Sequence, residues 1–392
     1  MSPIEKIEVI PLRVGGSDIE DCDGTVDTVV VRLTDSEGRT GIGESDASPE
    51  AVKAFLEMPT AHIWQKRASE ILIGSDPVEI AALWQRLYDS TIYSGRRGLG
   101  IHALSAVDLA LHDLAGKQLG MPAYKLMGGA RRQSLRPYCT IYPGLPKHRT
   151  LKELLAITGQ QFEQATSLGF GAVKMEVLYY DLVTDAELVE AIKEGRRMLG
   201  DGITMMLDFG YRWHDWHDAL WVLRQVENCN IYFAEATLQH DDLLGHGRLA
   251  QMSPIRVCGA ELAATRWEIR EWIEIGKVAV VQPDISRCGG LTEIRRIADM
   301  CELYGVQVIP HGWKTGILAA TGRHFQAACP SAPYFEFISP HVYKSPLRER
   351  LVRPEPSLKD GSMPLPTGPG LGVELDEDTV ETYRVKSASE RR

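Results

Sequence analysis

The amino-acid sequence predicts an α/β protein built around a (β/α)₈ barrel. After Gly128-Gly129, short apolar runs alternate with helix-length amphipathic segments, a rhythm typical of repeated βα units around a parallel sheet. Eight such runs occupy about 220 residues, which fits a closed barrel better than an open doubly wound sheet. The runs are 136–142, 171–177, 203–208, 231–235, 256–261, 278–284, 305–310 and 333–338.

The segment before the barrel predicts an α+β domain over residues 1–130. Residues 4–14 alternate between apolar and polar side chains, and residues 25–44 hold two β-rich runs around the turn Asp35-Ser36-Glu37-Gly38. From about residue 77 the pattern becomes helical, until Gly120-Met121-Pro122 ends the helix. A sheet followed by helices is therefore expected here.

The last segment differs in composition from the barrel, which we expect to span residues 131–355. From Leu358 onward the chain is rich in glycine and proline and then becomes β-like. It is too polar for a further barrel unit. We therefore expect residues 356–392 to return to the N-terminal domain.

Composition and charge exclude several classes of protein. The net charge of -10 argues against a nucleic-acid partner, because no basic face balances it. Seven widely spaced cysteines without a C-x-x-C pair predict free thiols in a reducing compartment. The N-terminus carries charge where a signal peptide needs an apolar stretch, and no apolar run reaches the roughly 20 residues of a membrane helix. A cytoplasmic protein without a membrane partner is expected.

Acidic residues end three consecutive barrel runs. Asp208, Glu235 and Glu261 lie 27 and 26 residues apart, one βα unit each. Because the carboxyl ends of barrel strands meet at one face, these acids are expected to converge. Like charges at such distances repel, and all-oxygen ligation without Cys or His favours Mg²⁺, with Mn²⁺ as a substitute. The alternative is that each acid caps the helix that follows it.

The other runs add groups suited to proton transfer. Asp284 and His311 end neighbouring runs, which would place a carboxylate beside an imidazole and raise its basicity. Lys174 and Glu176 lie two residues apart on one strand face, and Glu336 lies on the eighth run. The alternatives are a buried or capping histidine and a structural salt bridge at the barrel mouth.

Motifs along nearly the whole chain resemble the mandelate racemase subgroup of the enolase superfamily, in the order of that family. They are GIGE (Gly41–Glu44), Ser105–Gly129, the strand-end acids, QPDISRCGG, PHGWKTG and PGLGVEL (Pro369–Leu375). The resemblance implies a modified (β/α)₇β barrel, closed by a capping domain made of the N-terminal segment and the returning tail. Barrel enzymes of this kind are often even-numbered assemblies, so an even-numbered homo-oligomer is expected.

The resemblance also implies a chemistry. The three strand-end acids would hold Mg²⁺, and Asp284 with His311 would form a general acid/base dyad that removes the proton alpha to a carboxylate, giving an enediolate. Lys174 would stabilise the metal-bound carboxylate, and Glu336 would bond one of its oxygens. Together with the cation, Lys174 and a protonated Glu336 would neutralise the charge that develops.

One departure from the family narrows the reaction. The second strand usually carries K-x-K or K-x-H, whose last residue is a base on the face opposite the histidine; here it reads Lys174-Met175-Glu176. A racemase needs a base on each face, whereas β-elimination of water needs His311 alone. The sequence thus favours a sugar-acid dehydratase over a cycloisomerase, epimerase or racemase that forms the same enediolate from another carboxylate. Glu176 would serve as a second base only if burial raised its pKa.

The substrate is predicted to be a small polyhydroxylated acid. The capping loops are expected near residues 14–25 and 44–52, and both are polar, although they are also typical of solvated loops. The expected substrate contacts are Tyr93, Arg97, Trp213, Trp313 and Lys314. A barrel hydrolase is disfavoured because the first strand lacks an H-x-H pair, and a non-catalytic barrel is disfavoured because the ligand set and the dyad are intact.

Overall fold

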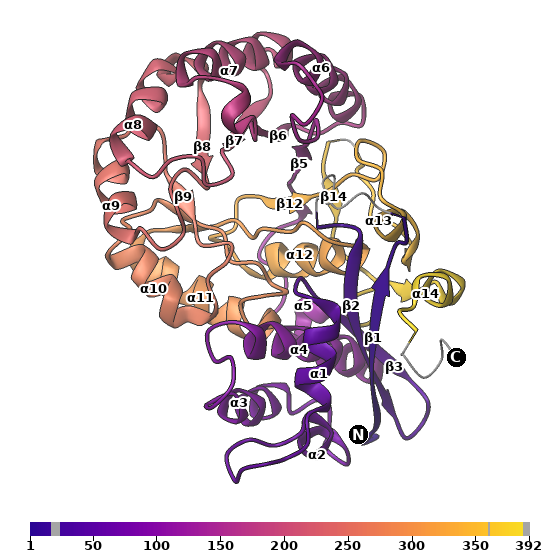
Figure 1. Ribbon diagram of the computed structural model, residues 1–392. Coiled ribbons are helices and arrows are strands. Elements are labelled where there is room, and N and C mark those ends of the chain that lie inside the picture. Colours follow the sequence, from indigo (N-terminus) through magenta and orange to yellow (C-terminus); the bar gives the residue numbers. More distant parts are fainter. Residues whose placement is uncertain (17–23, 360, 387–392) are drawn as a thin grey trace.

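The computed structural model describes residues 1–16, 24–359 and 361–386 of the chain. A ring of strands and helices forms the barrel, and a sheet with its own helices packs beside it (Figure 1). Among the described residues, no helix is both long and apolar enough to cross a membrane. The acidic residues 18, 20, 21 and 23 of the first expected capping loop lie outside the described residues.

The N-terminal domain consists of an antiparallel sheet covered by helices, as predicted. The sheet has the order β1-β2-β3, formed by β1 (Ile4–Arg13), β2 (Asp27–Asp35) and β3 (Thr40–Ser45). The helices are α1 (Pro49–Glu57), α2 (Ala68–Leu72), α3 (Ile80–Ser90), α4 (Leu99–Leu119) and α5 (Ala123–Leu126). The second capping loop is shorter than predicted, because α1 already begins at Pro49. Helix α4 ends before Gly120, as the sequence predicted, and Gly120 adopts a left-handed conformation there.

Helix α4 lies so close to β3 that only glycine fits at two strand positions. A Cβ atom at Gly43 would lie 2.1 Å from the carbonyl oxygen of Ala106, and one at Gly41 would lie 2.3 Å from that of Ala110. Both obstacles are helix backbone, which cannot rotate away. Close packing against α4 therefore explains the two glycines of the GIGE motif.

Gly43→Ala is therefore expected to destabilise the N-terminal domain by about 1–3 kcal/mol, the usual cost of overpacking. A lowered midpoint of thermal unfolding, followed by circular dichroism, would show it. Gly202→Ala is the matched control, because a Cβ atom there meets nothing within 4 Å. Equal melting temperatures for the two variants would contradict the packing argument.

The barrel contains eight strands and seven intervening helices within the described residues. The strands are β5 (Pro137–Ile141), β6 (Ala172–Glu176), β7 (Thr204–Asp208), β8 (Ile231–Glu235), β9 (Cys258–Gly259), β10 (Val280–Val281), β11 (Gln307–Val308) and β12 (Phe335–Phe337). The helices are α6 (Leu151–Ser167), α7 (Asp185–Leu199), α8 (Trp216–Gln225), α9 (Leu243–Met252), α10 (Thr265–Glu274), α11 (Gly290–Tyr304) and α12 (Gly316–Ala328). Short 3₁₀ turns are η2 (Tyr180–Leu182) and η3 (Glu227–Cys229). All eight predicted runs form strands, and seven helices alternate with them, so the architecture is the (β/α)₇β barrel that the family resemblance implied.

The ring closes through parallel pairing. Strands β12-β5-β6-β7-β8 form one sheet and β11-β10-β9 another. A parallel bridge between Ala234 and Val257 joins them on one side. On the other side the Glu336 N–H donates to the carbonyl of Pro310 over 3.4 Å.

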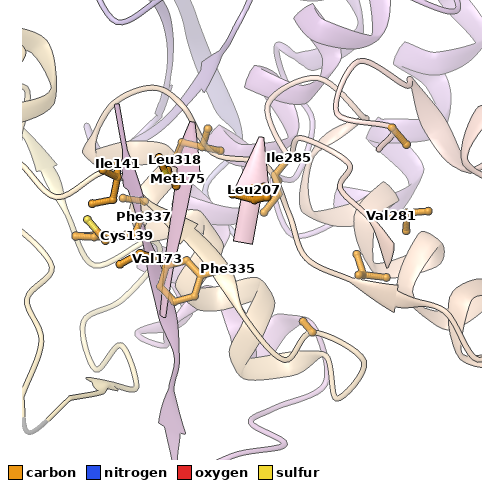
Figure 2. Packing of buried hydrophobic residues seen from close by; sticks show 14 of the residues in the cluster. Cys139, Ile141, Val173, Met175, Leu207, Val281, Ile285, Leu318, Phe335 and Phe337 are labelled. Atoms are coloured by element: carbon orange, nitrogen blue, oxygen red, sulfur yellow. The ribbon is translucent and has the colours of Figure 1, made fainter. Parts of the chain in front are cut away.

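Alternation along each strand separates the outer core from the inside of the barrel. Val173, Met175 and Leu207 point outward into the large apolar cluster between strands and helices (Figure 2). Their neighbours Ala172 and Met206 belong to the separate interior cluster. By the same period of two, Lys174 and Glu176 face the interior. The pattern that builds the core thus carries these charged groups inward.

The tail returns to the N-terminal domain, as expected. It contains β14 (Met363–Pro364), β15 (Glu374–Leu375) and helix α14 (Glu377–Tyr383), and it follows α13 (Pro346–Arg350) and β13 (Val352–Arg353) of the preceding segment. Strand β14 pairs with β4 (Ser134–Leu135), and Arg384 bridges to Leu12 of β1. Glu374 bonds Lys117 of α4 over 2.8 Å. The prediction of a β-like end was incomplete, because Asp376 caps a helix there.

Candidate active site

Parallel register brings the strand-end acids to one edge of the barrel. Glu176 lies opposite Asp208 in the β6–β7 pair, and Asp208 lies opposite Glu235 in the β7–β8 pair. Glu261 follows β9 by two residues, and its carboxylate lies 3.7 Å from the Nε2 atom of His311. Asp208, Glu235 and Glu261, here called the acid cluster, therefore face the same space as His311, which is the convergence that the sequence predicted.

Lys174 provides the positive charge at the base of this cluster. Its ammonium group is 1 % exposed and lies 2.9 Å from Glu235, 3.0 Å from Glu336 and 3.4 Å from Asp208. The Gln282 amide donates a further bond of 2.5 Å to Glu235. Buried charges require such partners, since an isolated ion inside a protein is strongly destabilised.

The three carboxylates of the acid cluster carry more negative charge than Lys174 can neutralise. A further cation would therefore be attracted to the acid cluster. Burial, opposed by Lys174 and aided by neighbouring acids, raises the pKa of Asp208 and raises that of Glu235 well above its ordinary value. A donor set of three carboxylates and no sulfur or imidazole matches a hard divalent cation. The acid cluster therefore fits the Mg²⁺ site that the sequence predicted.

The Asp284–His311 pair forms a hydrogen-bonded dyad. His311 Nδ1 and an Asp284 oxygen lie 2.6 Å apart, and Asp284 is fully buried. Burial disfavours the charged imidazole, but Glu261 and the bond to Asp284 outweigh it and raise the pKa of His311 to about 10. Because Nδ1 faces Asp284, Nε2 is the nitrogen that faces the acid cluster.

A second group of metal-ligand type overlaps the dyad. Donor atoms of Asp46, Asp284 and His311 lie within 4.8 Å of one another. However, Asp46 already forms ion pairs with Arg287 and with Lys314, the latter over 3.0 Å. Two cations beside one carboxylate leave little attraction for a metal ion. This group therefore suits a metal ion less well than the acid cluster does.

The surroundings of Glu336 lower its pKa, whereas the surroundings of Glu176 raise its pKa. Glu336 accepts bonds from the Thr140 hydroxyl and from the Gly312 N–H over 2.8 Å. Although burial opposes it, the charges of Lys174 and His311 lower the pKa of Glu336, so the protonated Glu336 expected from the sequence is not the form that this structure favours. Burial and the charge of Asp208 raise the pKa of Glu176 well above its ordinary value.

A cavity of about 350 Å³ opens over these groups. Four ionisable side chains of the predicted site line it, namely Glu176, Asp208, Glu261 and His311. Its walls are uncharged and consist of Tyr142, Leu145, Leu178, Tyr180, Gly210, Tyr211 and Trp313. The tyrosines were missed from the sequence; Tyr211 donates its hydroxyl to Glu261.

Of the predicted substrate contacts, the structure brings only Trp313 into this cavity. Lys314 is buried and donates to the carbonyl of Asp27 over 3.0 Å, so it ties the N-terminal domain to the barrel. The Trp213 ring packs on Phe209, and its N–H donates to Asp185 over 3.0 Å.

The other two predicted contacts lie at separate depressions. Tyr93 stacks on Trp64, which lines a larger cavity of about 460 Å³ that contains none of the strand-end acids. Arg97 lies 3.5 Å from Glu271 in a cavity of about 280 Å³. Neither residue lines the cavity over the acid cluster.

The barrel carries acids at three successive strand ends and a dyad on the next two strands, and both chain ends contribute to the cap. This combination defines a known class of enzyme. Residues 158–379 match the family model described as enolase C-terminal domain-like. Residues 21–128 match the mandelate racemase/muconate lactonizing enzyme N-terminal domain. The chain therefore belongs to the mandelate racemase and muconate lactonizing enzyme group of the enolase superfamily.

Two curated relatives catalyse different reactions. Arabinonate dehydratase of Saccharolobus solfataricus is 30% identical over 92% of both chains. D-galactarolactone cycloisomerase of Agrobacterium fabrum is 29% identical over 91% of both chains. One is a lyase and the other an isomerase, so membership indicates an enzyme but does not decide its class.

Two solved structures resemble the whole chain. A provisionally assigned racemase has 43% identity and a TM-score of 0.92, covering 97% of this chain and 98% of its own. A racemase from Streptomyces coelicolor A3(2), solved with bound magnesium, has 26% identity and a TM-score of 0.82, covering 97% and 100%. The second structure contains the ion for which the acid cluster here provides suitable ligands.

Proposed function

We propose that this protein is a Mg²⁺-dependent dehydratase of sugar acids. The observation that carries the proposal is the position of His311, whose Nε2 faces the acid cluster across one cavity while Nδ1 bonds Asp284. The dehydratases among the relatives and the magnesium in one related structure support it. Asp208, Glu235 and Glu261 would hold the ion.

The chemical difficulty is the weak acidity of the proton beside a carboxylate, because its removal places a second negative charge on the same group. A divalent cation, when bound, stabilises that charge as a Lewis acid. Lys174 lies within 3.0 Å of Glu235 and Glu336, so its ammonium group is aimed at the same region. These preorganised positive charges would lower the barrier to proton removal.

His311 would act twice. As a neutral base it takes the alpha proton at Nε2, and as imidazolium it gives that proton to the departing β-hydroxyl group, which leaves as water. Asp284 holds the ring and stabilises the charged form. A cation at Glu261 would withdraw part of the negative charge that now raises the pKa of His311, and so favour the basic form.

A sugar-acid cycloisomerase is the second candidate. The relative from Agrobacterium fabrum favours it, because that enzyme is an isomerase of similar coverage. Burial, and then the charge of Asp208, raises the pKa of Glu176, which is the condition under which the sequence allowed Glu176 to act as a second base. Dehydration remains the first candidate because β-elimination needs His311 alone, whereas a racemase needs a base on each face of the carbon.

Glu176→Gln is expected to leave turnover within a few-fold of wild type, because β-elimination needs His311 alone and glutamine keeps the size of the glutamate. The kcat on the best substrate measures this. A loss of about 10²-fold or more, the usual contribution of a general acid or base, would instead give Glu176 a proton-transfer role and favour epimerisation or racemisation.

A screen of aldonic and aldaric acids with Mg²⁺ tests the proposal. A dehydratase forms 2-keto-3-deoxy products, which semicarbazide detects, and each reaction has a parallel with a chelator. Product that appears only with Mg²⁺ supports the proposal. Isomerised acids or lactones without keto product would move the assignment to the cycloisomerase.

Within the screen, monocarboxylic acids are expected to exceed the matching dicarboxylic acids by about 10-fold or more in kcat/KM, the equivalent of about 1.4 kcal/mol. The reason is that the described cavity walls are uncharged, while a second carboxylate would need a cation there. Paired gluconate and glucarate, and galactonate and galactarate, give the comparison. Equal or better turnover of the dicarboxylic acids would contradict it.

A further inference from the structure

We infer that Ser286 is a positioning residue that holds the Asp284–His311 dyad and connects it to the capping domain. The inference rests on the proposed function, since it concerns the base of that reaction. It starts from Asp284, whose two carboxylate oxygens are both engaged. His311 Nδ1 bonds one of them over 2.6 Å. The N–H and the hydroxyl of Ser286 donate to the other over 2.7 and 2.6 Å.

This double contact fixes the plane of the Asp284 carboxylate. Three hydrogen bonds to two oxygens leave it no rotation without breaking one, and Asp284 and Ser286 are both fully buried. The orientation of the imidazole depends on that plane, because Nδ1 follows the oxygen to which it is bonded. Ser286 thereby determines where Nε2 points.

The same serine is held from the other side by the capping domain. Strand β3 ends at Ser45, and the N–H of Asp46 donates to the Ser286 hydroxyl over 3.1 Å. The Ser45 hydroxyl donates to the Ser286 carbonyl, also over 3.1 Å. An unbroken chain of hydrogen bonds therefore runs from the Asp46 backbone through Ser286 and Asp284 to His311.

A half-buried arginine and a buried lysine stabilise this contact. Arg287 pairs with the Asp46 carboxylate, and its Nε donates to the Asp46 carbonyl over 3.2 Å. Lys314, three residues after His311, lies 3.0 Å from the same carboxylate. The segments that carry Asp284 and His311 are thus both bound to one capping-domain residue. This gives the Asp46, Asp284 and His311 group a role that requires no metal ion.

The arrangement has a functional consequence. The loop after β3 is bonded to the residue that holds the dyad, so the packing of the cap on the barrel supports the orientation of the base. Removing the Ser286 hydroxyl would break the chain in the middle, while both domains keep their own cores. Proton transfer would suffer, and binding of the metal ion and the substrate would not.

Ser286→Ala tests the inference. We expect kcat to fall by about 10- to 100-fold, the usual effect of losing such a supporting partner, with KM within about threefold. Exchange of the substrate alpha proton with ²H₂O should fall in parallel, Mg²⁺ affinity should stay unchanged, and Ser286→Thr, which keeps a hydroxyl, should restore most of the rate. Ser253→Ala is the matched control, because that serine makes similar local bonds to Ile255 away from the site.

A second measurement keeps the inference independent of the substrate. The proton between His311 and Asp284 should give a far-downfield ¹H NMR signal that His311→Asn removes. We expect Ser286→Ala to shift or broaden this signal and Ser253→Ala to leave it unchanged. An unaltered signal in Ser286→Ala, or a kcat within twofold of wild type, would overturn the positioning role. If no sugar acid is turned over, the proposed function fails while the NMR result still decides this point.

Discussion

Replacement of His311 by asparagine is expected to lower kcat by about 10²- to 10⁴-fold, the range that a general acid–base contributes. Asparagine can keep a bond to Asp284 through its amide, so the buried carboxylate retains a partner. It cannot take up a proton. Exchange of the alpha proton with ²H₂O should therefore stop together with turnover, measured by NMR on the substrate.

His217→Asn is the control for this variant. His217 lies on the exposed surface next to Asp215, with which it makes a bond of 2.8 Å, so it also has a carboxylate partner. The His217→Asn variant should exchange the alpha proton of the substrate and turn it over at the wild-type rates. If His311→Asn loses turnover but keeps exchange, the alpha proton is removed by another group, and Lys174 or Glu176 would become the base.

Replacement of Glu235 by glutamine is expected to abolish Mg²⁺ binding at millimolar concentration and turnover with it. Glu235 is fully buried and is the member of the acid cluster closest to Lys174. Glutamine preserves its size but removes one charge from the donor set. Loss of an outer partner of a metal ligand usually lowers metal affinity by roughly 10- to 100-fold. Loss of a ligand charge should lower the affinity by more than this.

Isothermal titration with Mg²⁺ or Mn²⁺ measures this loss. Glu190→Gln is the matched control, because it removes the same charge from an exposed residue of α7 that pairs only with Lys193 over 2.9 Å in the described structure. Metal binding in the control should equal that of wild type. Retained metal-dependent activity in Glu235→Gln would refute the assignment of the ligands.

The sequence predicted the barrel, and the convergence of the candidate site residues at one edge of it, because both follow from periodicity. The alternation that buries Val173 and Met175 in the outer core necessarily turns Lys174 and Glu176 inward. The strand-end acids are offset by one βα unit, so their convergence follows from the barrel itself. The absence of an eighth barrel helix was implied by the family resemblance and not by periodicity.

Substrate contacts were harder to predict because loop side chains follow no period. Trp213 and Tyr211 are two residues apart on the same loop, yet Tyr211 reaches Glu261 and Trp213 packs on Phe209. Tyr93 and Arg97 belong to a connection whose path over the barrel depends on domain packing. Ser286 was visible within QPDISRCGG, but a serine two residues after an acid is common in turns and gave no sign of its contact with the cap.

The position of the metal ion tests the account most directly. A crystal grown with Mn²⁺ in place of Mg²⁺ would show the ion in an anomalous difference map, without any substrate. We predict one peak between the carboxylates of Asp208, Glu235 and Glu261, on the side of the cavity that His311 faces. A peak at Asp46, Asp284 and His311, or none at the acid cluster, would contradict the proposed chemistry.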